Sequence, residues 1–266
     1  MSKFVVVVFP NETRAYEGTR ALKDLHVDGS LSLYGMAVIA KDAAGNVKVK
    51  ESVDPGPLGT AVGALLGGLV GVIGGPAGVI AGATGGTVLG SLFDIVNLGV
   101  GEDYVTKVSE ELGPGKTAII AEVDENWTTP LDTRMGALNG TVLRTWRSDF
   151  EDDQIAKEVA AEEADFEALK AEYAQATAEA KANLKAKLDQ AKADLKKADA
   201  RLQARIDELN KEMDARLAAQ EKQIATAQAE AKEKIKKRMA AIRADYTART
   251  AKLKQAWQLT KEALAA

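Results

Sequence analysis

The sequence of 266 residues predicts an α+β protein with three parts. These are a ferredoxin-like sheet domain over residues 1–150, a glycine-zipper helical hairpin inserted into it at 56–98, and a long C-terminal helix or coiled coil over 151–266. Three observations lead to this prediction. Short β-branched runs alternate with helical segments in the first part. Glycine recurs every four residues in the middle. The last part lacks Gly and Pro and is rich in Ala, Lys, Glu, Leu and Arg, a composition typical of a long helix.

The sheet domain follows from local signals. The run KFVVVVF is β-branched and stops at Pro10, Asn11 suits a helix start, AAGN suits a hairpin turn, and Asn139-Gly140 suits a helix end. We therefore predict strands at 3–9, 30–41, 47–52, 116–123 and 141–146, and helices at 11–25, 103–112 and 129–138. Without the insertion and the last helix and strand, this order is that of a ferredoxin-like sandwich.

Two rows of glycine with a spacing of four run through the middle of the chain. They consist of Gly59, Gly63, Gly67, Gly71 and Gly75, and of Gly74, Gly78, Gly82, Gly86 and Gly90. No charged residue occurs between Asp54 and Asp94. Glycine inside a helix costs roughly 0.5–1 kcal/mol relative to alanine, so close backbone packing must offset that cost. The strict spacing favours packed helices over a flexible glycine-rich loop.

The length of the two predicted arms bears on membrane insertion. Residues 58–73 and 77–93 would each form a helix of about 25 Å, slightly less than a hydrocarbon core of about 30 Å. Three placements stay open: a thin two-helix span, a re-entrant hairpin, or a water-soluble oligomer with the hairpin buried at its centre.

An apolar stripe with a period of eleven residues marks the C-terminal part. Its members are Leu202, Met213, Ile224, Ile235, Tyr246 and Trp257. Eleven residues over three turns favour a nearly straight or right-handed coiled coil, of about 165 Å if the helix is unbroken. Residues 151–179 carry 10 acidic and 2 basic side chains, whereas 232–262 carry 3 acidic and 10 basic ones. We therefore expect antiparallel pairing of two chains, which places the acidic end against the basic end.

No catalytic, cofactor-binding or metal-binding constellation is predicted. The chain has no cysteine, and its one histidine, His26, is expected at the surface near a helix end. Gly115-Lys116-Thr117 resembles the end of a P-loop, but the motif needs glycine where Glu110 stands, and a strand is predicted to follow. We predict that the protein is not an enzyme.

Other groups have simple structural interpretations. The acidic cluster at 151–153 suits the positive end of a helix dipole. We interpret Trp127, Trp146 and Trp257 as core or interface residues, and the basic run 232–238 as a solvated face that could also meet anionic lipid.

The segments FVVVVFP and ENWTTPLDTRMGALNGTVLRTWRSDFEDDQIAKE, together with the glycine hairpin, resemble a bacterial family. It is the domain of unknown function twelve sixty-nine, an uncharacterised membrane protein. The resemblance covers about residues 3–160. It implies membrane association and no known activity, so no functional residues can be carried over. The long C-terminal tail departs from the family.

The leading hypothesis is a self-assembling scaffold that associates with a membrane through the hairpin and oligomerises through the zipper and the coiled coil. Its predicted partners are other copies of itself and a lipid bilayer, with no nucleic acid and no small-molecule substrate. The N-terminus lacks the pattern of a signal peptide, so we expect the cytoplasmic face of the inner membrane or a cytoplasmic assembly. Alternatives are lipid binding by the amphipathic C-terminal helix, a soluble assembly, and a ligand-binding or catalytic sheet domain.

Overall fold

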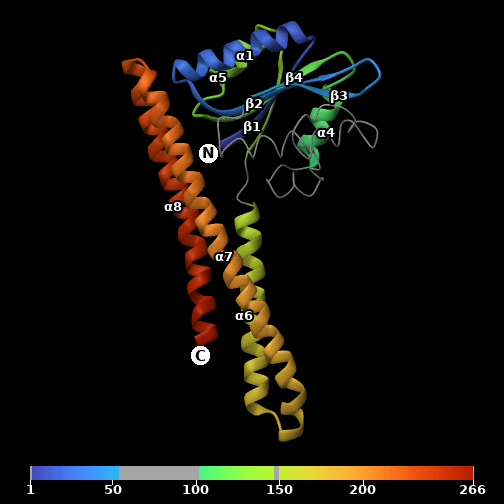
Figure 1. The fold of residues 1–266 in the computed structure, drawn as a ribbon, viewed down its shortest axis with the longest axis vertical. Coiled ribbons are helices and arrows are strands. Elements are labelled where there is room, and N and C mark those ends of the chain that lie inside the picture. Colours follow the sequence, from blue (N-terminus) through green and yellow to red (C-terminus); the bar gives the residue numbers. More distant parts are fainter. Residues whose placement is uncertain (1, 54–101, 147–149, 266) are drawn as a thin grey trace. The chain divides into compact units, whose positions relative to one another are not determined.

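The computed structural model describes residues 2–53, 102–146 and 150–265. It is a mixed α/β structure with one antiparallel sheet and several long C-terminal helices (Figure 1). The strands are β1 (Ser2–Phe9), β2 (Leu31–Lys41), β3 (Val47–Val53), β4 (Thr117–Glu125) and β5 (Thr141–Trp146). The helices are α1 (Glu12–Val27), α4 (Glu102–Glu111), α5 (Thr129–Gly136), α6 (Phe150–Gln175), α7 (Ala178–Thr226) and α8 (Ala229–Ala265). The five predicted strands and the three predicted helices of the sheet domain are confirmed within two residues at most of their ends.

The sheet has the strand order β3-β2-β4-β1-β5, and each neighbouring pair is antiparallel. Helix α1 connects β1 to β2, which lie on either side of β4. Helix α5 connects β4 to β5, which lie on either side of β1. β3 extends the sheet at one edge through its hairpin with β2.

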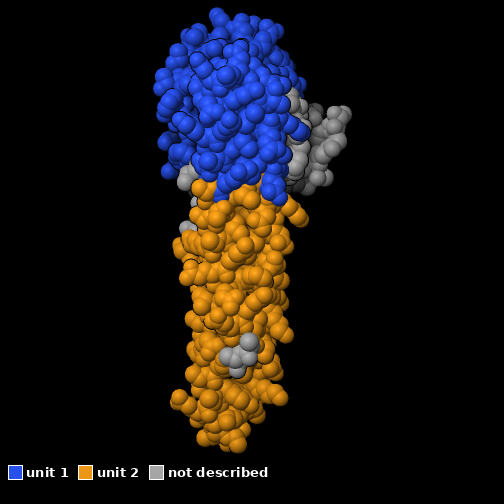
Figure 2. Space-filling model, turned by 90° about the vertical axis from the view of Figure 1, so that its left-hand side faces the viewer, with its two compact units in different colours: residues 1–148, 214–243 blue, residues 149–213, 244–266 orange. Residues whose placement is uncertain are grey.

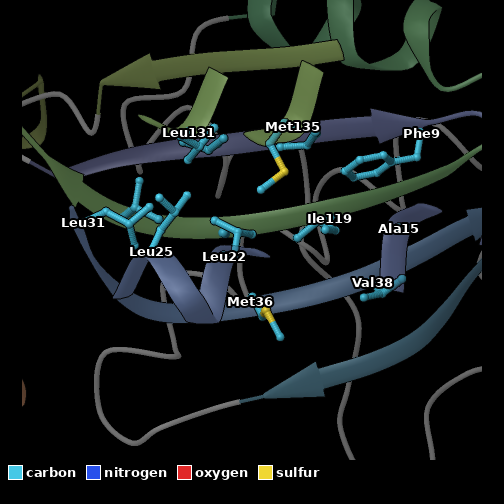
Figure 3. Close-up of a cluster of buried hydrophobic side chains, with 14 residues drawn as sticks. Phe9, Ala15, Leu22, Leu25, Leu31, Met36, Val38, Ile119, Leu131 and Met135 are labelled. Atoms are coloured by element: carbon cyan, nitrogen blue, oxygen red, sulfur yellow. The ribbon is translucent and has the colours of Figure 1, made fainter. Parts of the chain in front are cut away.

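Helices cover both faces of the sheet (Figure 1). On one face, α1 and α5 pack on alternate residues of the strands (Figure 3), among them Val7, Phe9 and Ile119. On the other face, α4 packs on the remaining alternate residues, among them Val6 and Ile120. The strands β1 and β4 are therefore apolar on both sides, which explains their nearly continuous hydrophobic sequence.

A side-chain hydrogen bond determines where helix α1 begins. Asn11 caps the helix, since its side chain accepts a hydrogen bond of 3.0 Å from the backbone N–H of Arg14. Leu22 and Leu25 of this helix are buried, while Tyr16 is half-buried.

The C-terminal part forms long helices, as predicted, but it is not one unbroken helix. The chain leaves helical conformation at residues 176–177 and again at 227–228, and forms α6, α7 and α8. Neither break contains Gly or Pro. The sequence A-T-A-E-A-K at 176–181 and the similar A-Q-A-E-A-K at 227–232 mark the two breaks.

The described chain forms two compact units, coloured separately in Figure 2. The first contains residues 1–148 and 214–243, and therefore includes the end of α7 and the start of α8. The second contains residues 149–213 and 244–266. The sequence predicted two domains that meet after residue 150. This division into domains stays a prediction.

The eleven-residue stripe is turned away from solvent. Leu202, Ile235 and Tyr246 are buried, and Met213, Ile224 and Trp257 are half-buried. The chain itself therefore covers three of these side chains and shields the other three in part.

Two glycines near the α5–β5 connection give a test of this packing. A Cβ at Gly140 would lie 2.7 Å from Phe9 Cε1 and 3.0 Å from the Met135 carbonyl oxygen, whereas a Cβ at Gly136 would meet nothing within 4 Å. Gly140→Ala should destabilise the protein by about 1–3 kcal/mol because the core must shift. Gly136→Ala should be neutral or stabilising by up to about 1 kcal/mol, because alanine favours a helix. Urea unfolding measures both, and equal effects would contradict the packing of this corner.

Candidate functional site: a buried polar network between the sheet and a helical hairpin

Four buried polar side chains line part of the sheet face that α4 covers elsewhere. Ser32 and Tyr34 belong to β2, and Glu122 and Asp124 belong to β4. All four are at most 2% exposed. Because alternate residues of a strand face the same side, Glu122 and Asp124 continue the row that begins with the apolar Ala118 and Ile120. The row thus changes from apolar to acidic along a single strand.

The helices supply matching groups. Arg216, Gln220 and Gln223 follow the i, i+4, i+7 spacing that places them on one face of α7. Arg238 comes from α8, and all four side chains are buried. We call residues 214–243, which belong to the same compact unit as the sheet, the docked hairpin.

An ion pair lies at the centre of the network. The Arg216 guanidinium donates a hydrogen bond from Nη2 to Glu122 Oε1, and its Nη1 lies 4.0 Å from Asp124 Oδ2. The same guanidinium lies over the Tyr34 ring, 4.6 Å from its centroid. The Tyr34 hydroxyl donates to Asp124 Oδ2 at 2.7 Å and accepts from Gln220 Nε2 at 2.8 Å. Each sheet group therefore has a partner on α7 or on a neighbouring strand.

A second set of bonds holds the start of β2. Ser32 Oγ donates to Gln223 Oε1 at 2.6 Å, and Gln223 Nε2 donates to the Leu31 carbonyl at 2.9 Å. Arg238 donates to Ser32 Oγ at 2.7 Å and to the Gly29 carbonyl at 2.9 Å. Gly29 has a positive φ of 75°, and the helix approaches it so closely that a Cβ there would lie 2.8 Å from the Cβ of Ala231.

The environment fixes protonation states. Burial, and then the charge of Asp124, raise the pKa of Tyr34 well above its usual value, so the phenol stays protonated and remains a donor. Burial, and then the charge of Arg238, lower the pKa of His26. The His26 Nδ1 accepts a hydrogen bond of 3.2 Å from the Leu33 N–H, which requires that nitrogen to be unprotonated.

The contacts of this site attach the helices to the sheet. Removing charged groups from water is costly, and a buried pair recovers that cost only with well-placed partners. Such a pair adds little net stability compared with apolar packing, but it penalises any other docking position of the helix. Within the ranges that the structure describes, no group of His, Asp and Glu side chains could hold a metal ion.

The structure gives a mixed outcome for the residues singled out in the sequence. His26 lies near the end of α1 as expected, but it is half-buried and hydrogen-bonded rather than a free surface group. Lys116 donates to Glu111 at 2.9 Å, and the strand predicted after it is present as β4. Asp152 is buried and bonds both Arg205 and Arg249 at 2.7 Å. Acidic and basic segments thus meet within one chain.

Of the two interpretations of the tryptophans, core or interface, the exposure of Trp127 and Trp146 excludes the core, and the interface stays a prediction. Trp127 is 74% exposed and Trp146 is 56% exposed, while Trp257 is half-buried. In the basic run 232–238, Lys234, Lys236 and Lys237 are exposed as predicted. Arg238 is buried instead.

Sequence reasoning missed the network itself. The residues concerned are Arg216, Gln220, Gln223 and Arg238 on the helices and Glu122 and Asp124 on β4. A signal was present, since carboxylates in a strand that is otherwise apolar on both sides need buried partners.

The predicted zipper glycines, from Gly59 to Gly90, lie outside the described residues. Among the helices that the structure does describe, none combines the length and apolar composition needed to cross a membrane.

The fold and site thus define an α/β sheet domain with a helical hairpin attached through buried polar groups. Residues 60–160 match the model of a family described as "Protein of unknown function (DUF1269)". The match confirms the family resemblance for residues 60–160, and it does not include the segment FVVVVFP. No curated protein and no solved structure matches the chain.

Removing the central arginine should loosen the docked hairpin. Arg216→Met leaves Glu122 buried without its cation and should cost about 3–5 kcal/mol of the free energy of unfolding. Arg201 provides the control, since its side chain is 50% exposed and pairs with Glu158 and Glu162. Arg201→Met should cost less than about 1 kcal/mol. Urea unfolding of both variants is the measurement, and similar small costs would contradict the importance of the pair.

The protonation of His26 should make stability depend on pH. Its pKa is lower in the folded chain than the ordinary value of 6.5, so the unfolded chain binds the proton more readily. The contribution of His26 is therefore complete above about pH 7.5, falls as the pH drops below about 6.5, and is lost once the pH has passed through the lower pKa of the folded chain. His26→Gln should reduce this slope. Because the chain has one histidine, its imidazole NMR signals report the pKa directly, and a value at or above 6.5 would contradict the buried, neutral ring.

Proposed function

We propose that the protein is a non-enzymatic, self-assembling structural protein that associates with membranes through its glycine-rich segment and oligomerises through it. The sheet domain and the docked hairpin serve as the rigid support of that segment. We also propose that the sheet is a ferredoxin-like domain with β3 added at one edge. The two crossovers through α1 and α5, each spanning one intervening strand, support this assignment.

One observation carries the proposal: both ends of the segment 54–101 are attached to the same sheet. Its N-terminal end continues β3, whose last residue, Val53, pairs with Met36 of β2. Its C-terminal end leads into α4, where the Tyr104 hydroxyl donates to the Leu143 carbonyl at 3.3 Å. From β3 to β1 there are three strand spacings, or about 15 Å. Two packed helices have axes 8–10 Å apart, so the attachment points suit a hairpin.

The C-terminal helices support a structural role over lipid-surface binding. A helix that binds a lipid surface presents its apolar side to the bilayer. In α8, however, Ile235 and Leu253 are fully buried in the chain. In the second unit, Phe166 of α6 and Leu195 of α7 pack together with Ala263 of α8. The alternative of lipid binding by this helix would require these contacts to open.

Bulky residues in the glycine rows should prevent assembly. Gly67→Leu combined with Gly82→Leu fills the space in which two backbones would approach, so we expect smaller particles on size-exclusion chromatography in detergent and in buffer. The control is Gly113→Leu with Gly136→Leu, at two sites where a Cβ meets nothing within 4 Å.

The outcomes of this experiment separate the alternatives. Unchanged assembly of the zipper variant would show that the glycine rows do not hold the copies together. Carbonate extraction of cells that express the unaltered chain tests the membrane. If the chain assembles but is fully extracted, membrane association is wrong and the soluble assembly replaces it.

A further inference from the structure

Two tryptophans and a valine stand out on the surface of the sheet domain. Trp127 is 74% exposed, Val27 is 60% exposed and Trp146 is 56% exposed. Tryptophan is usually well covered in folded proteins, because its ring is large and apolar. Exposed apolar residues that gather in one place indicate a surface that meets another apolar phase or a partner.

The strand register places these side chains at one end of the sheet. Ser2 pairs with Asp124, and Lys3 pairs with Trp146, so the start of β1 meets the ends of β4 and β5. Leu31 pairs with Glu125, which brings the start of β2 to the same end. Trp127 follows the end of β4 by two residues. Val27 ends α1, four residues before the start of β2.

The described residues that flank the glycine-rich segment lie toward this same end. β3 is antiparallel to β2, so its last residue points toward the end where β2 begins. Helix α4 starts beside the same end of β1, where the Tyr104 hydroxyl lies 3.5 Å from the Phe4 carbonyl. After α4, the chain enters β4 at the opposite end of the sheet. The elements that precede and follow the uncharged stretch between Asp54 and Asp94 thus connect to it at the end of the sheet where the two tryptophans lie.

Charged side chains near Trp146 form ion pairs with one another. Lys3 Nζ lies 4.5 Å from the centroid of the Trp146 ring and 3.2 Å from Glu125 Oε1. Arg144 binds Glu125 at 2.7 Å and Asp132 at 2.6 Å, and also donates to the carbonyl of Thr128, next to Trp127. Arg144 and Glu125 therefore connect the end of β5, which carries Trp146, to the residues that follow β4, which carry Trp127.

We propose that Trp127 and Trp146 are interfacial anchors, which lie in the headgroup region of the bilayer that the glycine-rich segment enters. An indole ring has an apolar body and a polar N–H, and it therefore favours the boundary between water and hydrocarbon. The inference rests on the proposed membrane association. It adds the face of the sheet domain that touches lipid and the orientation of the domain on the membrane.

The test uses the full chain with Trp257→Phe, so that only the two surface tryptophans fluoresce. It is reconstituted into vesicles of phosphatidylethanolamine and phosphatidylglycerol that contain lipid brominated near the headgroup. We expect quenching of most of the emission and a shift to shorter wavelength. Trp127→Ser with Trp146→Ser should weaken partitioning into vesicles by about tenfold or more. Leu259→Ser, at an exposed apolar residue of α8, is the control and should change partitioning little.

The results distinguish this inference from the function on which it rests. Flotation with vesicles without quenching overturns the anchor role and leaves membrane association intact. A blue-shifted emission in the absence of lipid, lost on dilution, assigns the surface to a second copy and also overturns it. Failure of the unaltered chain to float with vesicles overturns both.

Discussion

A carboxylate in the middle of the central strand sets the main constraint on this structure. Glu122 lies on β4, between β1 and β2, where its side chain is fully buried. A charge in such a place needs a cation with directed hydrogen bonds, and Arg216 of α7 supplies it. Because the helical residue is almost a hundred positions away in sequence, the sheet reaches its native environment only when the hairpin is docked. This explains why one compact unit contains two separate stretches of chain.

The apolar stripe of the C-terminal helices imposes the second constraint. A single straight helix would leave the stripe exposed, unless a second chain covered it. With the two breaks, the chain buries three of the six stripe residues and half-buries the other three, and ion pairs complement the apolar contacts. Asp152 links α6 to both α7 and α8 through Arg205 and Arg249. The acidic and basic segments, whose charges suggested pairing between two chains, therefore form ion pairs within one chain at Asp152.

The sheet could be predicted from sequence because its signals are local. The run of valines in β1, the cap at Asn11 and the turn before Asn139-Gly140 each act within a few residues. The helix breaks were not predictable in this way, since Ala176-Thr177 and Ala227-Gln228 have ordinary helical propensity and only tertiary packing selects the turn there.

The network was missed for a similar reason: Arg216 and Arg238 resemble solvent-facing residues of a charged helix until the sheet is present. When a helix is considered alone, arginine and glutamine side chains indicate a face exposed to solvent. Only the acidic residues of β4 show that this face is buried against the sheet. The same reasoning applies to Trp127 and Trp146, which the sequence suggested as core or interface residues. Trp127 lies two residues past the end of β4, Trp146 is the last residue of β5, and both side chains are exposed.

Native-state hydrogen exchange tests most directly whether the sheet and the docked hairpin are one cooperative unit. Amides of β4 around Glu122 and amides of α7 between Arg216 and Ile224 should open with the same free energy and the same dependence on denaturant, because neither part keeps its partners without the other. If the amides of α7 exchange through a much smaller opening while β4 remains protected, the hairpin is an attachment on a sheet that is stable without it, and the account is contradicted.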